Sequence, residues 1–134
     1  MLRLFALVAC LTLPIAVGCG PAGPTKHAVQ GQVTLDGQPI AEGKILLRDP
    51  TRQVGSVEAS IVDGAYELET LPGPKRVEIT ALKEVPLPGG RANVEGDTTT
   101  FVEAIPARYN SKSTLELEID SDLDQQNFEL TSKR

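Results

Sequence analysis

The chain has 134 residues, the length of a single domain, and a formal net charge of −5. Its 13 basic residues against 18 acidic ones exclude the clustered positive charge that nucleic-acid binding and polybasic membrane-surface binding require. Aromatic residues make up 4% of the sequence and tryptophan is absent, so stacking platforms for bases or sugars are scarce.

The chain opens with a segment typical of export. Residues 1–19 read MLRLFALVACLTLPIAVGC, in which Arg3 supplies a positive charge and the run from Leu4 to Val17 is apolar except for Thr12 and Pro14. This run is shorter than the roughly 20 apolar residues of a spanning helix. It fits the apolar region of a signal peptide, which has about 7–15 residues.

The end of this segment resembles the lipobox of bacterial lipoproteins, because the small residues Ala16, Val17 and Gly18 precede Cys19. Ala16 departs from the Leu usual in that motif. The resemblance implies a signal peptide over residues 1–18, cleavage before Cys19, and acyl chains such as palmitate on that cysteine. The alternatives are an ordinary signal peptide cut near Gly18 and an uncut anchor.

The cysteine count favours lipidation. Cys10 and Cys19 are the two cysteines of the chain, so cleavage would leave one thiol at the new N-terminus, where a disulfide within the domain is impossible. Residues 19–27 then form a lipidated cysteine and a Gly/Pro tether. We therefore expect a cell-envelope protein with membrane lipid as a partner through Cys19. Gly20 favours the outer membrane over the inner one.

Apolar and polar residues alternate with period two through residues 28–131, which predicts half-buried strands. Asp63-Gly64 lies between two alternating runs and is the strongest hairpin signal; Asp36-Gly37 and residues 71–74 also predict turns. Residues 84–98 break the pattern and are expected to form a long loop. The predicted strands lie at 29–35, 44–48, 57–61, 66–69, 76–81, 99–104, 115–119 and 127–130.

Three stretches together resemble a known domain family. They read VQGQVTLDGQPIAEGKILL, IVDGAYELETLPGPKRVEI and PARYNSKSTLELEI, followed by a closing NFEL. They are similar to the carboxypeptidase-regulatory-like and transthyretin-like (prealbumin-like) domains over residues 28–131. The resemblance implies an all-β, seven-stranded antiparallel Greek-key sandwich, usually non-catalytic, that serves as a spacer, an adhesive module or a sugar- or protein-binding accessory.

Relatives with chemistry use groups that this sequence does not supply. Transthyretin-like hydrolases need several histidines and a terminal Tyr-Arg-Gly-Ser, whereas this chain has one, His27, and ends in Thr-Ser-Lys-Arg. Metallocarboxypeptidases need a zinc triad of His and Glu, which this chain cannot supply either. Isopeptide-forming repeats need a lysine in the first strand, and Val29–Leu35 has none. We therefore predict no catalytic residue, no metal ligand and no cofactor.

Three weaker candidates for a site remain in the sequence. Asp120, Asp122 and Asp124 alternate and could bind Ca²⁺, although a solvated acidic turn is the simpler interpretation. The 84–98 loop is either an interaction surface or a solvated loop without a role. Tyr109, with its neighbours Arg108 and Asn110, either contacts a glycan or packs at the sandwich edge.

The sequence thus favours a non-enzymatic, membrane-anchored envelope lipoprotein that is a monomer. Its sandwich would contact envelope protein or glycan, or act as a spacer. The alternative is a calcium-dependent binding module or a hydrolase that uses the acidic 120–124 turn or the 84–98 loop.

Overall fold

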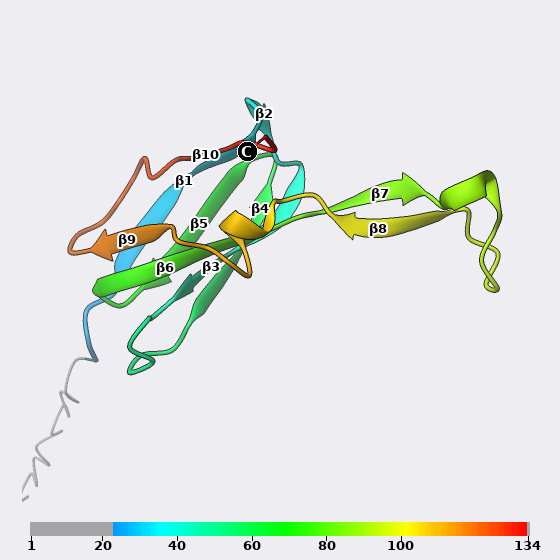
Figure 1. The fold of residues 1–134 in the computed structure, drawn as a ribbon. Helices are drawn as coiled ribbons and strands as arrows, with labels where there is room; N and C mark the ends of the chain where they lie inside the picture. The colour runs from blue at the N-terminus through cyan, green and yellow to red at the C-terminus, as the bar shows by residue number, and fades with distance from the viewer. Residues whose placement is uncertain (1–22, 134) are drawn as a thin grey trace, which may run out of the picture.

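The computed structural model describes residues 23–133, which form ten strands and two short 3-10 helices (Figure 1). Eight strands form one curled sheet, in which seven follow the order β10-β1-β5-β4-β3-β6-β9 and β2 pairs with β1. β7 and β8 form a separate two-stranded sheet. The arrangement is consistent with a β-sandwich and confirms the all-β prediction. The elements are β1 (His27–Leu35), β2 (Gln38–Pro39), β3 (Glu42–Arg48), β4 (Val57–Val62), β5 (Ala65–Thr70), β6 (Gly73–Thr80), β7 (Leu82–Pro86), η1 (Pro88–Gly90), β8 (Thr99–Glu103), η2 (Ala107–Tyr109), β9 (Glu116–Ile119) and β10 (Phe128–Leu130).

The period-two pattern becomes the two faces of the curled sheet. In β5, Tyr66, Leu68 and Thr70 are buried while the residues between them are exposed. The same alternation places Val29 and Val33 of β1 at 0% exposure. Predicted inward residues of β3, β4, β6 and β10 are buried as well: Ile45, Leu47, Ile61, Val77, Ile79, Phe128 and Leu130. Val57 and Ala59, the other two on the inward face of β4, are half-buried.

Two Asp-Gly turns connect neighbouring strands at one end of the sheet. Asp63 and Gly64 have φ of 49° and 82°, and Asp36 and Gly37 have φ of 52° and 81°. Positive φ at both central residues is the type I′ hairpin geometry that Asp-Gly favours. Both turns predicted from the sequence are therefore confirmed.

One irregular segment, residues 121–127, runs beside β1 and is called the strap below. Gln30 donates its N–H to the Leu123 carbonyl at 2.8 Å, and Gln126 donates its N–H to the Gln30 carbonyl at 2.9 Å. The strap leads into β10, which pairs with β1 in parallel, the exception in an otherwise antiparallel sheet. Because the strap and β10 cover this edge, β1 lies inside the sheet.

The strap approaches β1 closely at a glycine. A Cβ on Gly31 would lie 2.0 Å from the Gln126 carbonyl oxygen, so only glycine fits there. The buried Tyr66 hydroxyl donates to the same carbonyl at 2.6 Å. Gly31 and Tyr66 together fix the strap against the sheet.

Residues 82–103 form a hairpin that projects from the sandwich, as Figure 1 shows, and are called the arm below. Residues 84–86 belong to β7 and pair with β8, so the predicted loop over 84–98 is wrong for its first three residues. Their pairing with Thr99–Phe101 extends the hairpin, a non-local contact that the local Pro and Gly content concealed. The predicted short strand after residue 98 is confirmed as β8.

The arm leaves the sandwich at the end opposite the tether. His27 pairs with Thr70, and Gly73 opens β6 shortly after, so these residues mark the tether end. β6 then runs away from that end to Thr80, where the arm starts. β1 itself begins at His27, one residue before the expected start of the domain.

Candidate functional site

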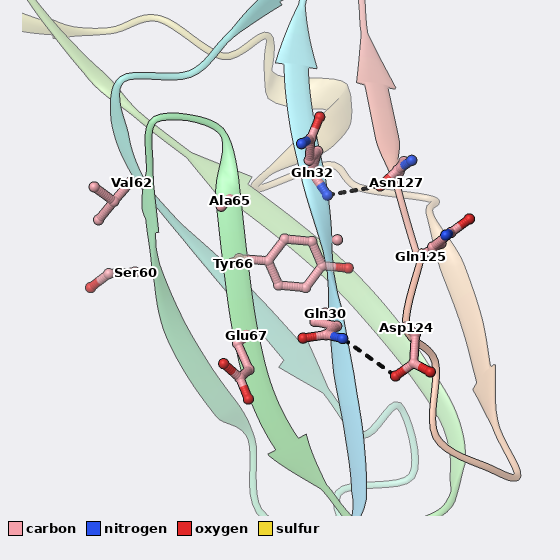
Figure 2. Close-up of a pocket in the computed structure, with 11 residues that line it drawn as sticks. Gln30, Gln32, Ser60, Val62, Ala65, Tyr66, Glu67, Asp124, Gln125 and Asn127 are labelled. Carbon is pink, nitrogen blue, oxygen red and sulfur yellow. Dashed lines mark hydrogen bonds between the residues drawn. The ribbon is translucent and has the colours of Figure 1, made fainter.

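A polar groove of about 630 Å³ lies along the outer side of β1, between β4 and β5 on one side and the strap on the other (Figure 2). Its floor is the exposed face of the sheet, because the alternation that buries Val29 and Val33 turns the intervening residues outward. The seven polar side chains that line the groove are Gln30, Gln32, Ser60, Glu67, Asp124, Gln125 and Asn127, all of them exposed.

The strap supplies one wall of this groove and is held by side chains as well as by backbone. Asn127 Oδ1 accepts the Gln32 N–H at 2.8 Å, and Gln30 Nε2 donates to Asp124 Oδ1 at 3.4 Å, as drawn in Figure 2. The Tyr66 ring lies beneath, between β5 and the strap. The contact between Gly31 and Gln126 therefore holds the strap against β1 and, at the same time, positions the wall of the groove.

Several groups of the groove remain available to a ligand. Within residues 23–133, the side chains of Gln32, Gln125 and Glu67 make no hydrogen bond to the protein. An amide offers both an N–H₂ donor pair and a carbonyl acceptor, and a carboxylate accepts only. The groove can thus hydrogen-bond a molecule that carries many hydroxyl or amide groups.

The charge of the groove restricts that ligand further. Glu67 and Asp124 contribute two carboxylates, and the described lining contains no Lys, Arg or His. A negative potential with no cation nearby disfavours anionic ligands. Neutral or amine-bearing polyols suit these electrostatics best.

The acidic turn at residues 120–124 is largely occupied by structural contacts. Asp122 Oδ1 accepts from the Ala28 N–H at 3.0 Å and lies 3.2 Å from His27 Nδ1, so it joins the strap to the start of β1. Asp124 contacts Gln30, and Asp120 accepts from the Ser121 hydroxyl. Residues 23–133 contain no group of three or more Asp, Glu, His or Cys side chains that could hold a metal ion.

Residues 108–110 hold the C-terminal segment. The Arg108 guanidinium lies 4.6 Å from the centroid of the Tyr109 ring and donates to the carbonyls of Thr131 and Lys133. Hydrogen bonding to Thr131, and then to Arg108, lowers the pKa of Tyr109. Asn110 is buried and donates to the Ile105 carbonyl at 3.1 Å. The edge-packing interpretation accounts for these contacts.

The expected loop region ends in an ordered turn at the tip of the arm. Asn93 Oδ1 accepts the N–H groups of Glu95 and Asp97, each at 2.9 Å. Residues 91–98 are all exposed.

The sequence analysis missed the groove because its residues come from distant parts of the chain. The outward Gln30 and Gln32 were visible as the polar half of an alternating strand, but nothing local indicated that the strap would lie beside them. The predicted lipidation site, Cys19, lies outside the described residues. The described part of the chain has no helix with the length and hydropathy needed to cross a membrane.

Comparison with protein-family models, curated proteins and solved structures gave no match.

Proposed function

We propose that the chain is a non-enzymatic envelope lipoprotein, held to a membrane by lipid on Cys19, whose β-sandwich contacts an uncharged or amine-bearing glycan through the polar groove. The observation that carries the glycan assignment is the lining of this groove: four amides, two carboxylates and a serine, all exposed, from β1, β4, β5 and the strap. Sugars present closely spaced hydroxyls and acetamido groups, and amide side chains can donate to and accept from both.

A glycan fits this groove better than a protein partner does. Protein interfaces are enriched at their centres in aromatic residues, Met and Arg, and depleted in Glu and Asp. Here the lining is dominated by amides and carboxylates, and its one aromatic residue, Tyr66, is 4% exposed with its hydroxyl engaged by Gln126. The polar lining therefore favours a hydroxyl-rich polymer.

The anchor is supported by the residues that lead to Cys19 and by the position of the tether. A single acyl chain binds a membrane only marginally, whereas two chains give stable anchoring. Since β1 begins at His27, the seven residues 20–26 would separate the lipid on Cys19 from the domain. Tethering at that end leaves the length of the groove open to the envelope.

The glycan assignment is tested by binding of the full chain to neutral glucan, to chitin oligosaccharides and to acidic alginate. We expect binding to one of the first two and none to alginate. The double variant Gln32→Ala/Gln125→Ala should lose at least about tenfold in affinity, the value of one or two hydrogen bonds. Gln53→Ala, an exposed amide outside the groove, is the matched control and should bind like wild type. Equal binding by all variants, or preference for alginate, would refute the assignment.

The anchor is tested separately by metabolic labelling with a clickable fatty acid. The wild-type chain and Cys10→Ser should be labelled, and Cys19→Ser should not. Equal labelling of wild type and Cys19→Ser would exclude Cys19 as the site.

A further inference from the structure

The arm exposes apolar side chains that the sandwich does not cover. Leu82 is 64% exposed, Phe101 is 66% exposed and Val102 is 37% exposed. Leu82 and Phe101 lie on the same face of the hairpin, because Leu82 pairs with Glu103 and Phe101 with Glu84 two residues along. Both side chains line a cavity of about 550 Å³ between the arm and the ends of β3 and β6 that lie next to it.

The hydrogen bonds of the hairpin show which backbone groups are open. Ala104 donates its N–H to the Ala81 carbonyl at 2.7 Å, and Leu87 donates to the Thr98 carbonyl at 2.9 Å. In an antiparallel ladder, bonded and non-bonded pairs alternate. The N–H and C=O groups of Thr99, Phe101 and Glu103 therefore point away from β7, and no partner strand covers them among residues 23–133.

The open edge of β7 is protected against pairing with a further strand, whereas the open edge of β8 is not. On β7 the outward positions are Leu82, Glu84 and Pro86, and the proline has no N–H to donate. Two β7 strands paired about Glu84 would also place one carboxylate opposite the other. β8 has the sequence Thr-Thr-Phe-Val-Glu, rich in strand-forming residues and without proline or lysine.

We propose that β8 pairs antiparallel with β8 of a second copy of this chain, with Phe101 opposite Phe101 across the two-fold axis. In this register, Thr99 lies opposite Glu103 of the copy, and the outward backbone groups of all three residues are paired. The two Phe101 rings then cover each other on the face that Leu82 shares.

The charges of β8 permit this pairing. Glu103 is its one charged residue, and its carboxylate accepts the N–H groups of Ala81 and Ile105, at 3.0 and 2.9 Å. It faces a neutral threonine of the copy, so no like charges meet. The inference replaces the sequence-based expectation of a monomer, and it does not depend on the glycan or on the lipid anchor.

Disulfide trapping tests the register in the full chain, with Cys10 and Cys19 changed to serine to remove competing thiols. In a hydrogen-bonded antiparallel pair the Cα atoms lie about 5.5 Å apart, within the range that a disulfide spans. Phe101→Cys should therefore form disulfide-linked homodimers under copper-catalysed oxidation, at least about tenfold faster than Val102→Cys. Val102 is the matched control, because its counterpart on the copy would be Thr100.

A second variant guards against a trapping artefact. Phe101→Lys places two like charges across the axis on an exposed position, so it should keep the secondary structure of wild type, measured by circular dichroism, and abolish the dimer seen by sedimentation equilibrium. Three results would overturn the proposal: equal trapping at positions 101 and 102, a wild-type chain that stays monomeric, or a Phe101→Lys chain that associates like wild type.

Discussion

The sandwich body and the β7–β8 arm are both built from paired antiparallel strands but differ in what covers their apolar side chains. In the body, Val33 and Ile79 are completely buried. In the arm, Leu82 and Phe101 keep about two thirds of their surface exposed. The packing around a strand thus decides whether its apolar side chains stabilise the fold or remain available to another molecule.

The largest expected effect is on the free energy of unfolding, which should respond very differently to a charge in the body and to a charge in the arm. Val33→Asp places a carboxylate in the body core, where a charge without a partner costs more than about 4 kcal/mol, comparable with the whole stability of a small domain. Phe101→Asp in the arm should change the free energy of unfolding by less than about 0.5 kcal/mol. Urea denaturation measures both values, and similar losses would mean that the arm packs against the body.

The strap gives the next largest effect. Gly31→Ala drives a Cβ into the Gln126 carbonyl, so we expect a loss of about 3 kcal/mol, at the upper end of the usual cost of overpacking, together with weakened glycan binding. Gly55→Ala is the matched control, since a Cβ there meets nothing within 4 Å. Thermal melts measure the stability of both variants, and binding curves measure their affinity for the glycan. A Gly31→Ala chain as stable as Gly55→Ala would contradict the role of the strap.

The body also buries a lysine, which tests whether its core is stabilised by apolar packing or by the charge. Lys75 is 2% exposed, and its ammonium makes one hydrogen bond, to the Pro72 carbonyl at 3.4 Å. Its aliphatic stem fills the core like an apolar side chain. Lys75→Ala should therefore cost about 2 kcal/mol of unfolding free energy by leaving a cavity, whereas Lys75→Met should stay within about 1 kcal/mol of wild type. Equal losses for both variants in urea denaturation would show that the ammonium itself is needed.

The smallest expected effect is on the pH dependence of stability, and it distinguishes a loop of the body, at Asp49, from the tip of the arm, at Asn93. Asp49 accepts hydrogen bonds from the Val54 N–H, the Thr51 hydroxyl and the Gln53 N–H, and these lower its pKa from 3.8 to about 2. Because the folded pKa is the lower one, this stabilisation is present above pH 3.8 and is lost as the pH falls toward 2. At the arm tip, Asn93 binds two backbone N–H groups with a neutral amide.

Melting temperatures of Asp49→Asn and Asn93→Ala between pH 6 and pH 2 test this difference. The gap between wild type and Asp49→Asn should narrow as the pH falls, and the gap for Asn93→Ala should stay constant. A gap for Asp49→Asn that does not change with pH would exclude a stabilising role for the charge.

The parts of the fold that depend on neighbours in the sequence could be predicted. Asp63-Gly64 specifies its hairpin because positive φ is needed at both positions, and the alternation in β1 and β5 identifies inward residues such as Val29 and Leu68. Lys75 shows the limit of the pattern: it occupies an inward position with Val77 and Ile79, although its charge suggests the surface.

The groove and the arm could not be predicted because both depend on long-range pairing. The strap meets β1 about 95 residues away along the chain, as between Gln32 and Asn127, and the reason for Gly31 becomes visible only when Gln126 is beside it. Similarly, the strand character of residues 84–86 comes from pairing with β8 across a turn rich in Gly and Pro.

The central claim, that a glycan is held in the groove of the body, is tested most directly by hydrogen–deuterium exchange. The measurement compares the full chain alone with the full chain saturated by whichever neutral glucan or chitin oligosaccharide it binds. Our account predicts slower exchange in β1, in β5 and in the strap, and unchanged exchange in the arm. Protection confined to residues 82–103, or none in either region, would contradict it.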